Sequence, residues 1–207
     1  MLIAEEFVLL ALTPEGNPAR GVSYQSGYAV GVTGALVTEL QLQGHLDLAD
    51  GRIHLTGSTP EHPLLHQVLD EVRTVEGKKL RSKLGTIRRS GWSEVVDGMV
   101  DQGLLGRVRP SKLQPTRHPV TDPDLHTAVV GRVRAVALGD ATLDFRDSTL
   151  IALAGPCQLL EVVAPDRGDR KHAKARIAEA SLVIPAADAV KYVIDSQNSA
   201  AVVAASS

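Results

Sequence analysis

Basic side chains, which bind phosphate, are concentrated in one stretch of this sequence. Residues 78–118 contain 10 Lys and Arg against 3 Asp and Glu, a net charge of +7. Residues 1–77 contain 3 and 10, and residues 119–207 contain 9 and 11, so the rest of the chain is acidic. Clustered guanidinium and ammonium groups can bind the phosphates of nucleic acid or lipid. The alternative is that they form a solvated helix face whose charges pair with acidic neighbours. We call residues 78–118 the basic block, and it is the first candidate for a binding surface.

The residue types that most often carry catalysis or metals form no recognisable pattern. His62 and His66 stand four apart, but no acidic or cysteine partner stands at a useful spacing for a metal. Cys157 follows a Gly-Pro pair and is expected to be a small buried side chain rather than a nucleophile. The sequence contains no Gly-rich phosphate loop and no Gly-x-Ser-x-Gly motif. We therefore expect a non-enzymatic protein without a metal or a cofactor.

The composition is that of a folded domain. Of the 207 residues, 43% are hydrophobic and 22% charged, which excludes a disordered chain, and the single cysteine excludes a disulfide scaffold. No apolar run approaches the ~20 residues of a membrane-spanning helix. Glu5 and Glu6 stand where a signal peptide carries positive charge. These features predict a cytoplasmic protein, and the excess of Arg over Lys with abundant Ala and Val is typical of a GC-rich bacterial gene.

Helical periodicity dominates the arrangement of the apolar residues. Residues 27–42 are apolar almost all round, which predicts a buried helix at the centre of the domain. Within the basic block, the spacing of Leu80, Leu84 and Ile87 predicts a helix over 79–89. Further helices are expected over 3–12, 64–72, 92–102, 123–138, 148–154, 171–182 and 187–194.

Two short β-hairpins interrupt the helices. The alternation of Leu46, Leu48, Ile53 and Leu55 around Asp50-Gly51 is a hairpin signal. A second hairpin begins at 104–109 and is closed by Pro110. The fold class predicted is therefore mainly α, a single globular domain over 1–197, with a flexible tail over 198–207.

The order helix, helix, hairpin within the basic block also resembles a winged helix that binds nucleic acid. In that alternative, Arg107 and Arg109 contact the phosphates of DNA. The second helix, however, carries Glu94, Asp97 and Asp101, and DNA repels an acidic recognition helix. This interpretation is kept as the second hypothesis.

Four stretches of sequence follow one another in a characteristic order. They are EEFVLLAL at 5–12, GALVTEL at 34–40 with QGHLDL at 43–48, PLLHQVL at 63–69, and MVDQGLL at 99–105 with HPVT at 118–121. Together they resemble the Golgi phosphoprotein 3 family, whose eukaryotic members bind phosphatidylinositol 4-phosphate and act as adaptors that retain Golgi enzymes. The resemblance implies a helical domain around a buried central helix and peripheral binding to a membrane.

The resemblance also implies a headgroup site. The family uses a tryptophan before the central helix, an arginine early in that helix, and two arginines three apart in the middle basic segment. The register of the matching stretches places Tyr24 and Thr33 at the first two of these positions, and Arg89 and Trp92 at the other two. Arg88 stands next to the third position. The residues expected to bind the lipid headgroup are therefore Tyr24, Arg88, Arg89 and Trp92.

The family uses the second hairpin for membrane contact and self-association. In this sequence the loop carries four cations, which the resemblance places at a membrane surface: Arg107, Arg109, Lys112 and Arg117. Attraction of basic residues to an anionic membrane contributes ~1 kcal/mol per residue near the surface. The implied partners are thus an anionic phospholipid, with phosphoinositides first, client proteins, and a second copy of the chain.

Overall fold

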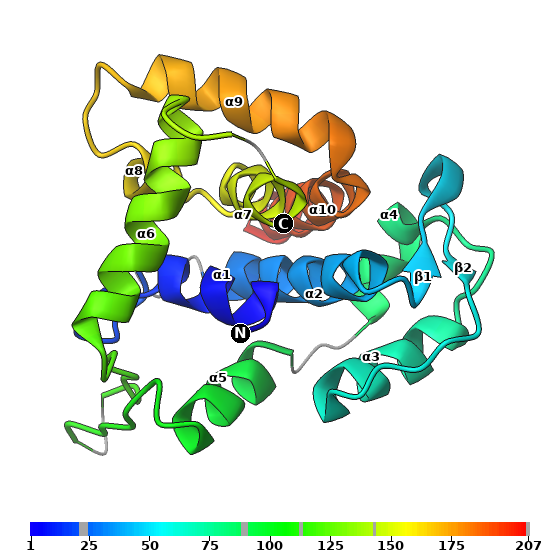
Figure 1. Cartoon of the computed structure of the whole chain (residues 1–207), viewed down its shortest axis with the longest axis horizontal. Helices are drawn as coiled ribbons and strands as arrows, with labels where there is room; N and C mark the ends of the chain where they lie inside the picture. The colour runs from blue at the N-terminus through cyan, green and yellow to red at the C-terminus, as the bar shows by residue number, and fades with distance from the viewer. Residues whose placement is uncertain (21–24, 88–90, 112–113, 143, 206–207) are drawn as a thin grey trace.

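The chain folds into helices of very unequal length that surround one buried helix (Figure 1). The structure is a computed structural model that describes residues 1–20, 25–87, 91–111, 114–142 and 144–205. The elements are α1 (Ile3–Ala11), α2 (Gln25–Leu42), β1 (Leu46–Asp47), η2 (Ala49–Gly51), β2 (His54–Leu55), α3 (Pro63–Arg73), α4 (Leu80–Lys83), η3 (Leu84–Thr86), α5 (Gly91–Asp101), α6 (Pro123–Leu138), α7 (Phe145–Ala154), α8 (Leu160–Val163), α9 (Arg170–Val183) and α10 (Pro185–Ala205).

Helix α2 is the central helix, as its composition predicts. Every residue from 31 to 40 is buried. In Figure 1, α1 runs beside α2, with α3 and α5 below the pair and α7, α9 and α10 above it. Two glycines allow this packing, because a Cβ at Gly31 would lie 2.4 Å from Cζ of Phe7 and one at Gly34 would lie 2.5 Å from Cγ2 of Val190. The predicted fold class, a mainly helical single domain, is confirmed.

The core also contains a network of charged side chains around the start of α1. Four carboxylates are at most 6% exposed as residues, those of Glu5, Glu6, Glu39 and Asp147. Arg132 pairs with both Glu6 and Asp147, and Arg146 pairs with Glu6 and Glu39. Burial raises the pKa of Asp147, and the positive charge of Arg132 opposes that rise. We call these six residues the carboxylate network; it fixes α1 against α2, α6 and α7.

The two predicted hairpins differ in regularity. The first forms β1 and β2, antiparallel, with Leu46 opposite Leu55. At its turn, Asp50 and Gly51 both have positive φ, 52° and 68°. The second has no strand among its described residues and is joined by two isolated bridges, Leu105 with Val120 and Val108 with Arg117. Pro110, Pro115 and Pro119 lie in this segment, and since proline has no N–H to donate, they interrupt a regular ladder.

Two segments depart from the sequence-based expectation. The helix predicted over 79–89 is instead α4 followed by the single turn η3, and Ile87 is already extended. Conversely, residues 198–205, expected as a frayed tail, continue α10. This end contains four alanines and no Gly or Pro, which favours helix.

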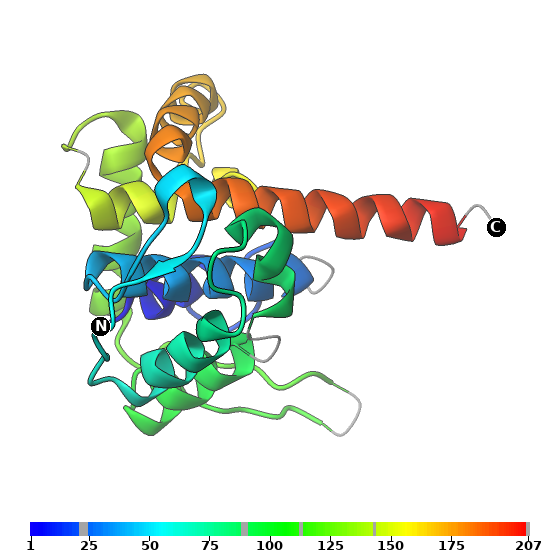
Figure 2. The same cartoon turned by 90° about the vertical axis from the view of Figure 1, so that its right-hand side faces the viewer.

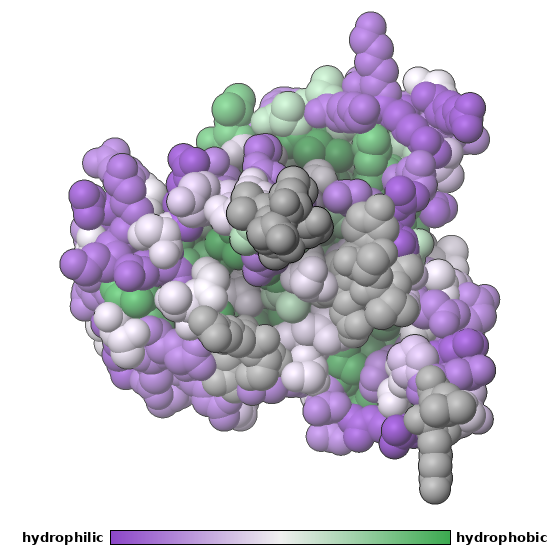
Figure 3. Space-filling model, turned by 180° about the vertical axis from the view of Figure 1, so that it is seen from behind, coloured by the Kyte–Doolittle hydropathy of each residue, from purple (hydrophilic) through white to green (hydrophobic). Residues whose placement is uncertain are grey.

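Three structural features point to the same side of the molecule. Figure 2 shows α10 extending far from the body, with the second hairpin and the N-terminal end of α2 directed the same way. This is the side seen in Figure 3, where hydrophilic surface surrounds small, separate hydrophobic areas. Among the residues that the structure describes, no helix is both long enough and apolar enough to cross a membrane.

Candidate functional site

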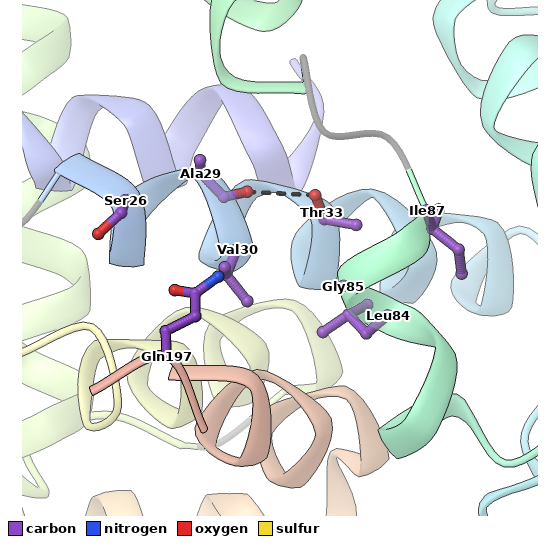
Figure 4. A pocket seen from close by; sticks show the side chains of 8 residues that line it. All are labelled: Ser26, Ala29, Val30, Thr33, Leu84, Gly85, Ile87 and Gln197. Atoms are coloured by element: carbon purple, nitrogen blue, oxygen red, sulfur yellow. Dashed lines mark hydrogen bonds between the residues drawn. The ribbon is translucent and has the colours of Figure 1, made fainter. Parts of the chain in front are cut away.

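A pocket opens beside the N-terminal half of α2, on the side to which the hairpin projects. Its volume is about 300 Å³. Figure 4 shows side chains from three elements around it: α2 contributes Ser26, Ala29, Val30 and Thr33, the α4–η3 region contributes Leu84, Gly85 and Ile87, and α10 contributes Gln197. We call it the α2 pocket. Two of its walls therefore come from segments about 55 and 165 residues further along the chain than the α2 residues that line it.

The described lining of the α2 pocket is neutral. Thr33, at the position where the family has an arginine, is 3% exposed, and its hydroxyl donates to the carbonyl of Ala29 at 3.1 Å. Ser26 and Gln197 supply a hydroxyl and an amide, and Ser26 lies in the first turn of α2, where backbone N–H groups favour an anion. Any full positive charge at this pocket must come from residues outside its described lining.

Three of the four expected headgroup residues, Tyr24, Arg88 and Arg89, lie outside the described residues. Described residues close to them in sequence line the pocket: Ser26 follows Tyr24 by two positions, and Ile87 directly precedes Arg88. Segments next to both parts of the expected site therefore line one pocket, and the positions of Tyr24, Arg88 and Arg89 themselves stay a prediction.

Trp92, the fourth expected residue, lies in the first turn of α5 and is half-buried. Its ring stacks on Tyr28 of α2, with ring centroids 5.9 Å apart and planes inclined by 30°. The Tyr28 hydroxyl accepts a hydrogen bond from the backbone N–H of Arg20 at 3.1 Å. Trp92 thus joins α5 to α2 and is not one of the described residues that line the α2 pocket.

The cations of the second hairpin have different environments. Arg107 pairs with Asp97 of α5, whereas Arg109 is exposed, and Lys112 lies outside the described residues. Arg117 is exposed and exchanges backbone hydrogen bonds with Val108, at 2.8 and 2.9 Å. Val108 is 48% exposed, so one apolar side chain stands among these cations.

The base of the hairpin is fixed to the turn that follows α1. The N–H of His118 donates to the carbonyl of Gly16 at 3.3 Å, and the N–H of Val120 donates to that of Pro14 at 3.0 Å. Gly16 has φ of 78°, and a Cβ there would lie 2.2 Å from the carbonyl carbon of His118. Burial lowers the pKa of His118.

Sequence reasoning missed the contribution of α10. Gln197 lines the α2 pocket, and the ring of Tyr192 lies under the guanidinium of Arg81, 4.4 Å from its carbon to the ring centroid. That contact occupies one cation of the basic block and holds α4 against α10. Its only trace in the sequence is an isolated tyrosine in a helix, which does not indicate a partner 111 positions away.

The cysteine and the histidine considered in the sequence have structural roles. Cys157 is buried, and burial raises the pKa of its thiol. The His62 ring accepts a hydrogen bond from the N–H of Leu64 at 3.2 Å and so caps α3. Within the described ranges, no group of three or more His, Cys, Asp or Glu side chains could hold a metal ion.

The structure does not support the winged-helix alternative. Glu94, Asp97 and Asp101 of α5 line one hollow of about 580 Å³ together with Glu5. A recognition helix in this position would bring those carboxylates to the phosphates of DNA, and one of the two hairpin arginines already pairs with Asp97.

The fold and the site define a class of protein. It is a helical domain built around one buried helix, and it has an open surface pocket, part of whose lining is followed in the sequence by basic residues. The chain belongs to the Golgi phosphoprotein 3 family, since the family's sequence profile, described as Golgi phosphoprotein 3 (GPP34), matches residues 3–197. This confirms the resemblance found in the sequence. The family is not a known enzyme family. A search of curated proteins finds none that is significantly similar to this chain.

Proposed function

We propose that this protein binds an anionic phospholipid headgroup, phosphatidylinositol 4-phosphate or a related phosphoinositide, at a membrane surface, where it acts as a peripheral adaptor. The observation that carries the proposal is the α2 pocket, which opens where the basic segment that contains Arg88 and Arg89 adjoins the N-terminal end of the central helix. In this proposal Arg88 and Arg89 supply the charge, Tyr24 covers the headgroup, and Trp92 holds α5 in place beside it.

The arrangement of the surface supports this proposal. The N-terminal end of α2, the hairpin with its exposed Arg109 and Arg117, and the far end of α10 all point to one side (Figures 2 and 3). A membrane on that side meets the hairpin cations and the α2 pocket together. Electrostatic attraction then draws the protein to the surface, and the pocket selects the headgroup.

Vesicle co-sedimentation tests the proposal. Vesicles of phosphatidylcholine alone are compared with vesicles that also contain phosphatidylinositol 4-phosphate, and with vesicles in which phosphatidylserine supplies the same surface charge. We expect binding to both anionic kinds, stronger for the phosphoinositide and weaker as salt rises. Equal sedimentation with neutral and anionic vesicles contradicts the proposal.

Charge-matched variants separate the pocket from general attraction. Arg88→Gln and Arg89→Gln each remove one cation beside the α2 pocket, whereas Arg73→Gln removes an exposed cation of α3 outside the basic block. Loss of a charge-assisted bond weakens phosphoinositide binding by about tenfold or more, and Arg73→Gln leaves it within about twofold. A tight, sequence-selective complex with duplex DNA would instead support the second hypothesis.

A further inference from the structure

Three hollows are linked by shared lining residues, and the N-terminal end of α2 lines two of them. The α2 pocket shares Ser26 and Gln197 with a small hollow of about 90 Å³ that lies against Cys157. That hollow shares Gln158 with a third one, of about 390 Å³, which extends to α8 and α9. We call the three together the α2 groove. Its two ends differ in chemistry, because the described lining of the α2 pocket is neutral and the far end is charged.

Positive charge predominates at the far end of the groove. Arg20, Arg170 and Lys174 line it, and Glu161 is the single acidic residue in its described lining. Arg20 and Arg170 both pair with Glu161, one on each carboxylate oxygen. One carboxylate thus serves two guanidinium groups, and the described lining carries a net charge of +2.

The two guanidinium groups are already held in position. Arg170 donates to Glu161 at 3.0 Å and to the carbonyls of Ala164 and Pro165 at 3.3 and 3.1 Å, and only 28% of its side chain is exposed. A preformed arginine loses little side-chain freedom when it binds an anion, and its planar fork fits the oxygens of a phosphate.

Lys174 supplies one of the two excess positive charges. It follows Arg170 by one helical turn on α9, lies at the same hollow, is exposed, and makes no ion pair with any described residue. Like charges four residues apart destabilise a helix, and a bound anion between them removes that repulsion. Gln158, at the junction of the hollows, has φ of 57°, and strained residues of this kind gather at ligand sites.

We propose that Arg20, Arg170 and Lys174 form a second anion subsite, which takes a phosphate group at the far end of the α2 groove. The phosphate is either that of a further lipid headgroup or a free phosphate. The proposed function supplies the lipid source, and the subsite extends it: a membrane then presents two phosphates to one groove, one at each side of the end of α2.

Inorganic pyrophosphate is the probe that tests the subsite without a membrane. In a titration followed by ¹H–¹⁵N NMR, we expect saturable shifts of the amides of Gly155, Gln158 and Arg170. Lys174→Gln abolishes or strongly weakens them. Lys171→Gln, the same change at an exposed position of the same helix that is not in the described lining, preserves them. Shifts that do not saturate, or that change equally in the two variants, overturn the proposal.

Vesicles then distinguish the two sources. If the phosphate belongs to a lipid, Lys174→Gln weakens binding to phosphatidylinositol 4-phosphate vesicles by about fivefold, and Lys171→Gln weakens it clearly less. If it is a free phosphate, the two variants bind vesicles alike while pyrophosphate still discriminates between them. Failure of the proposed function looks different: the wild-type protein saturates with pyrophosphate but sediments equally with neutral and anionic vesicles.

Discussion

Replacing Arg146 by Met tests whether the carboxylate network stabilises the fold. The Arg146 side chain is 24% exposed and pairs with Glu6 at 2.9 Å and Glu39 at 3.6 Å, whose side chains are 8% and 5% exposed. It also donates to the backbone carbonyl of Met1. Met keeps most of the aliphatic volume and removes the charge, so the change isolates the loss of the guanidinium.

The expected loss follows from what the two glutamates retain. Removal of one partner from a fully buried ion pair costs about 3–5 kcal/mol. Here Glu6 keeps Arg132 at 2.8 Å, and Glu39 still accepts from the N–H of Ile3 at 2.7 Å and from the Gln43 amide at 3.0 Å. Partial exposure of Arg146 lowers the cost further. We expect Arg146→Met to reduce the free energy of unfolding by about 2 kcal/mol.

Urea denaturation at neutral pH measures this, with Arg73→Met as the control. Arg73 pairs with Asp70 on the surface, where both side chains are about half exposed, so its removal costs roughly 0.5 kcal/mol or less. Adding Glu39→Gln to the Arg146→Met variant removes the uncompensated charge and recovers about 1 kcal/mol. The reasoning is refuted if Arg146→Met costs no more than Arg73→Met, or if the second substitution adds to the loss.

Three further predictions concern single residues. Gly16→Ala destabilises the protein by more than ~3 kcal/mol, because the new Cβ meets the backbone of His118. The control Gly57→Ala is also at positive φ but has nothing within 4 Å, and it costs about 1 kcal/mol. Equal shifts of the thermal unfolding midpoint in the two variants would contradict this. Burial raises the folded-state pKa of Asp147 above its unfolded value. As the pH falls through the raised pKa, the free energy of unfolding of the wild type should therefore increase relative to that of Asp147→Asn. A difference in urea denaturation that does not change with pH would contradict this. Trp92→Leu removes the ring stacked on Tyr28 and lowers the free energy of unfolding by about 1–2 kcal/mol; a thermal unfolding midpoint at the wild-type value would contradict the role of this stack.

The sequence predicts the central part of this fold well and its charged parts poorly. Residues 27–42 are apolar on every face, and that composition requires burial wherever the other helices lie. The carboxylate network has no such local signature. Glu6 and Glu39 look like surface residues in the sequence, and their burial depends on arginines more than 90 positions away.

The candidate headgroup residues stay a prediction. The matching stretches assign Tyr24 and Arg89 to one site, and both lie outside the described residues; Ser26 and Ile87, which stand close to them in sequence, line one pocket. The third wall could not be foreseen, because the Ser and Asn residues around Gln197 suggest a frayed end. The helix over 79–89 was overestimated, since apolar spacing fits one turn of α4 as well as a long helix. Gly85, in the middle of that range, lowers helix propensity.

The contact at Gly16 has a mechanical consequence. The turn that follows α1 is joined to α1 by the N–H of Ala19, which donates to Ala11 at 2.8 Å, and every residue of α1 is buried. The base of the hairpin lies against this turn, with no space for even a methyl group between the two backbones. The base of the hairpin is therefore held firmly against the body and does not act as a hinge. Whatever holds the hairpin sets the tilt of the whole domain, and with it the direction in which the end of α2 faces.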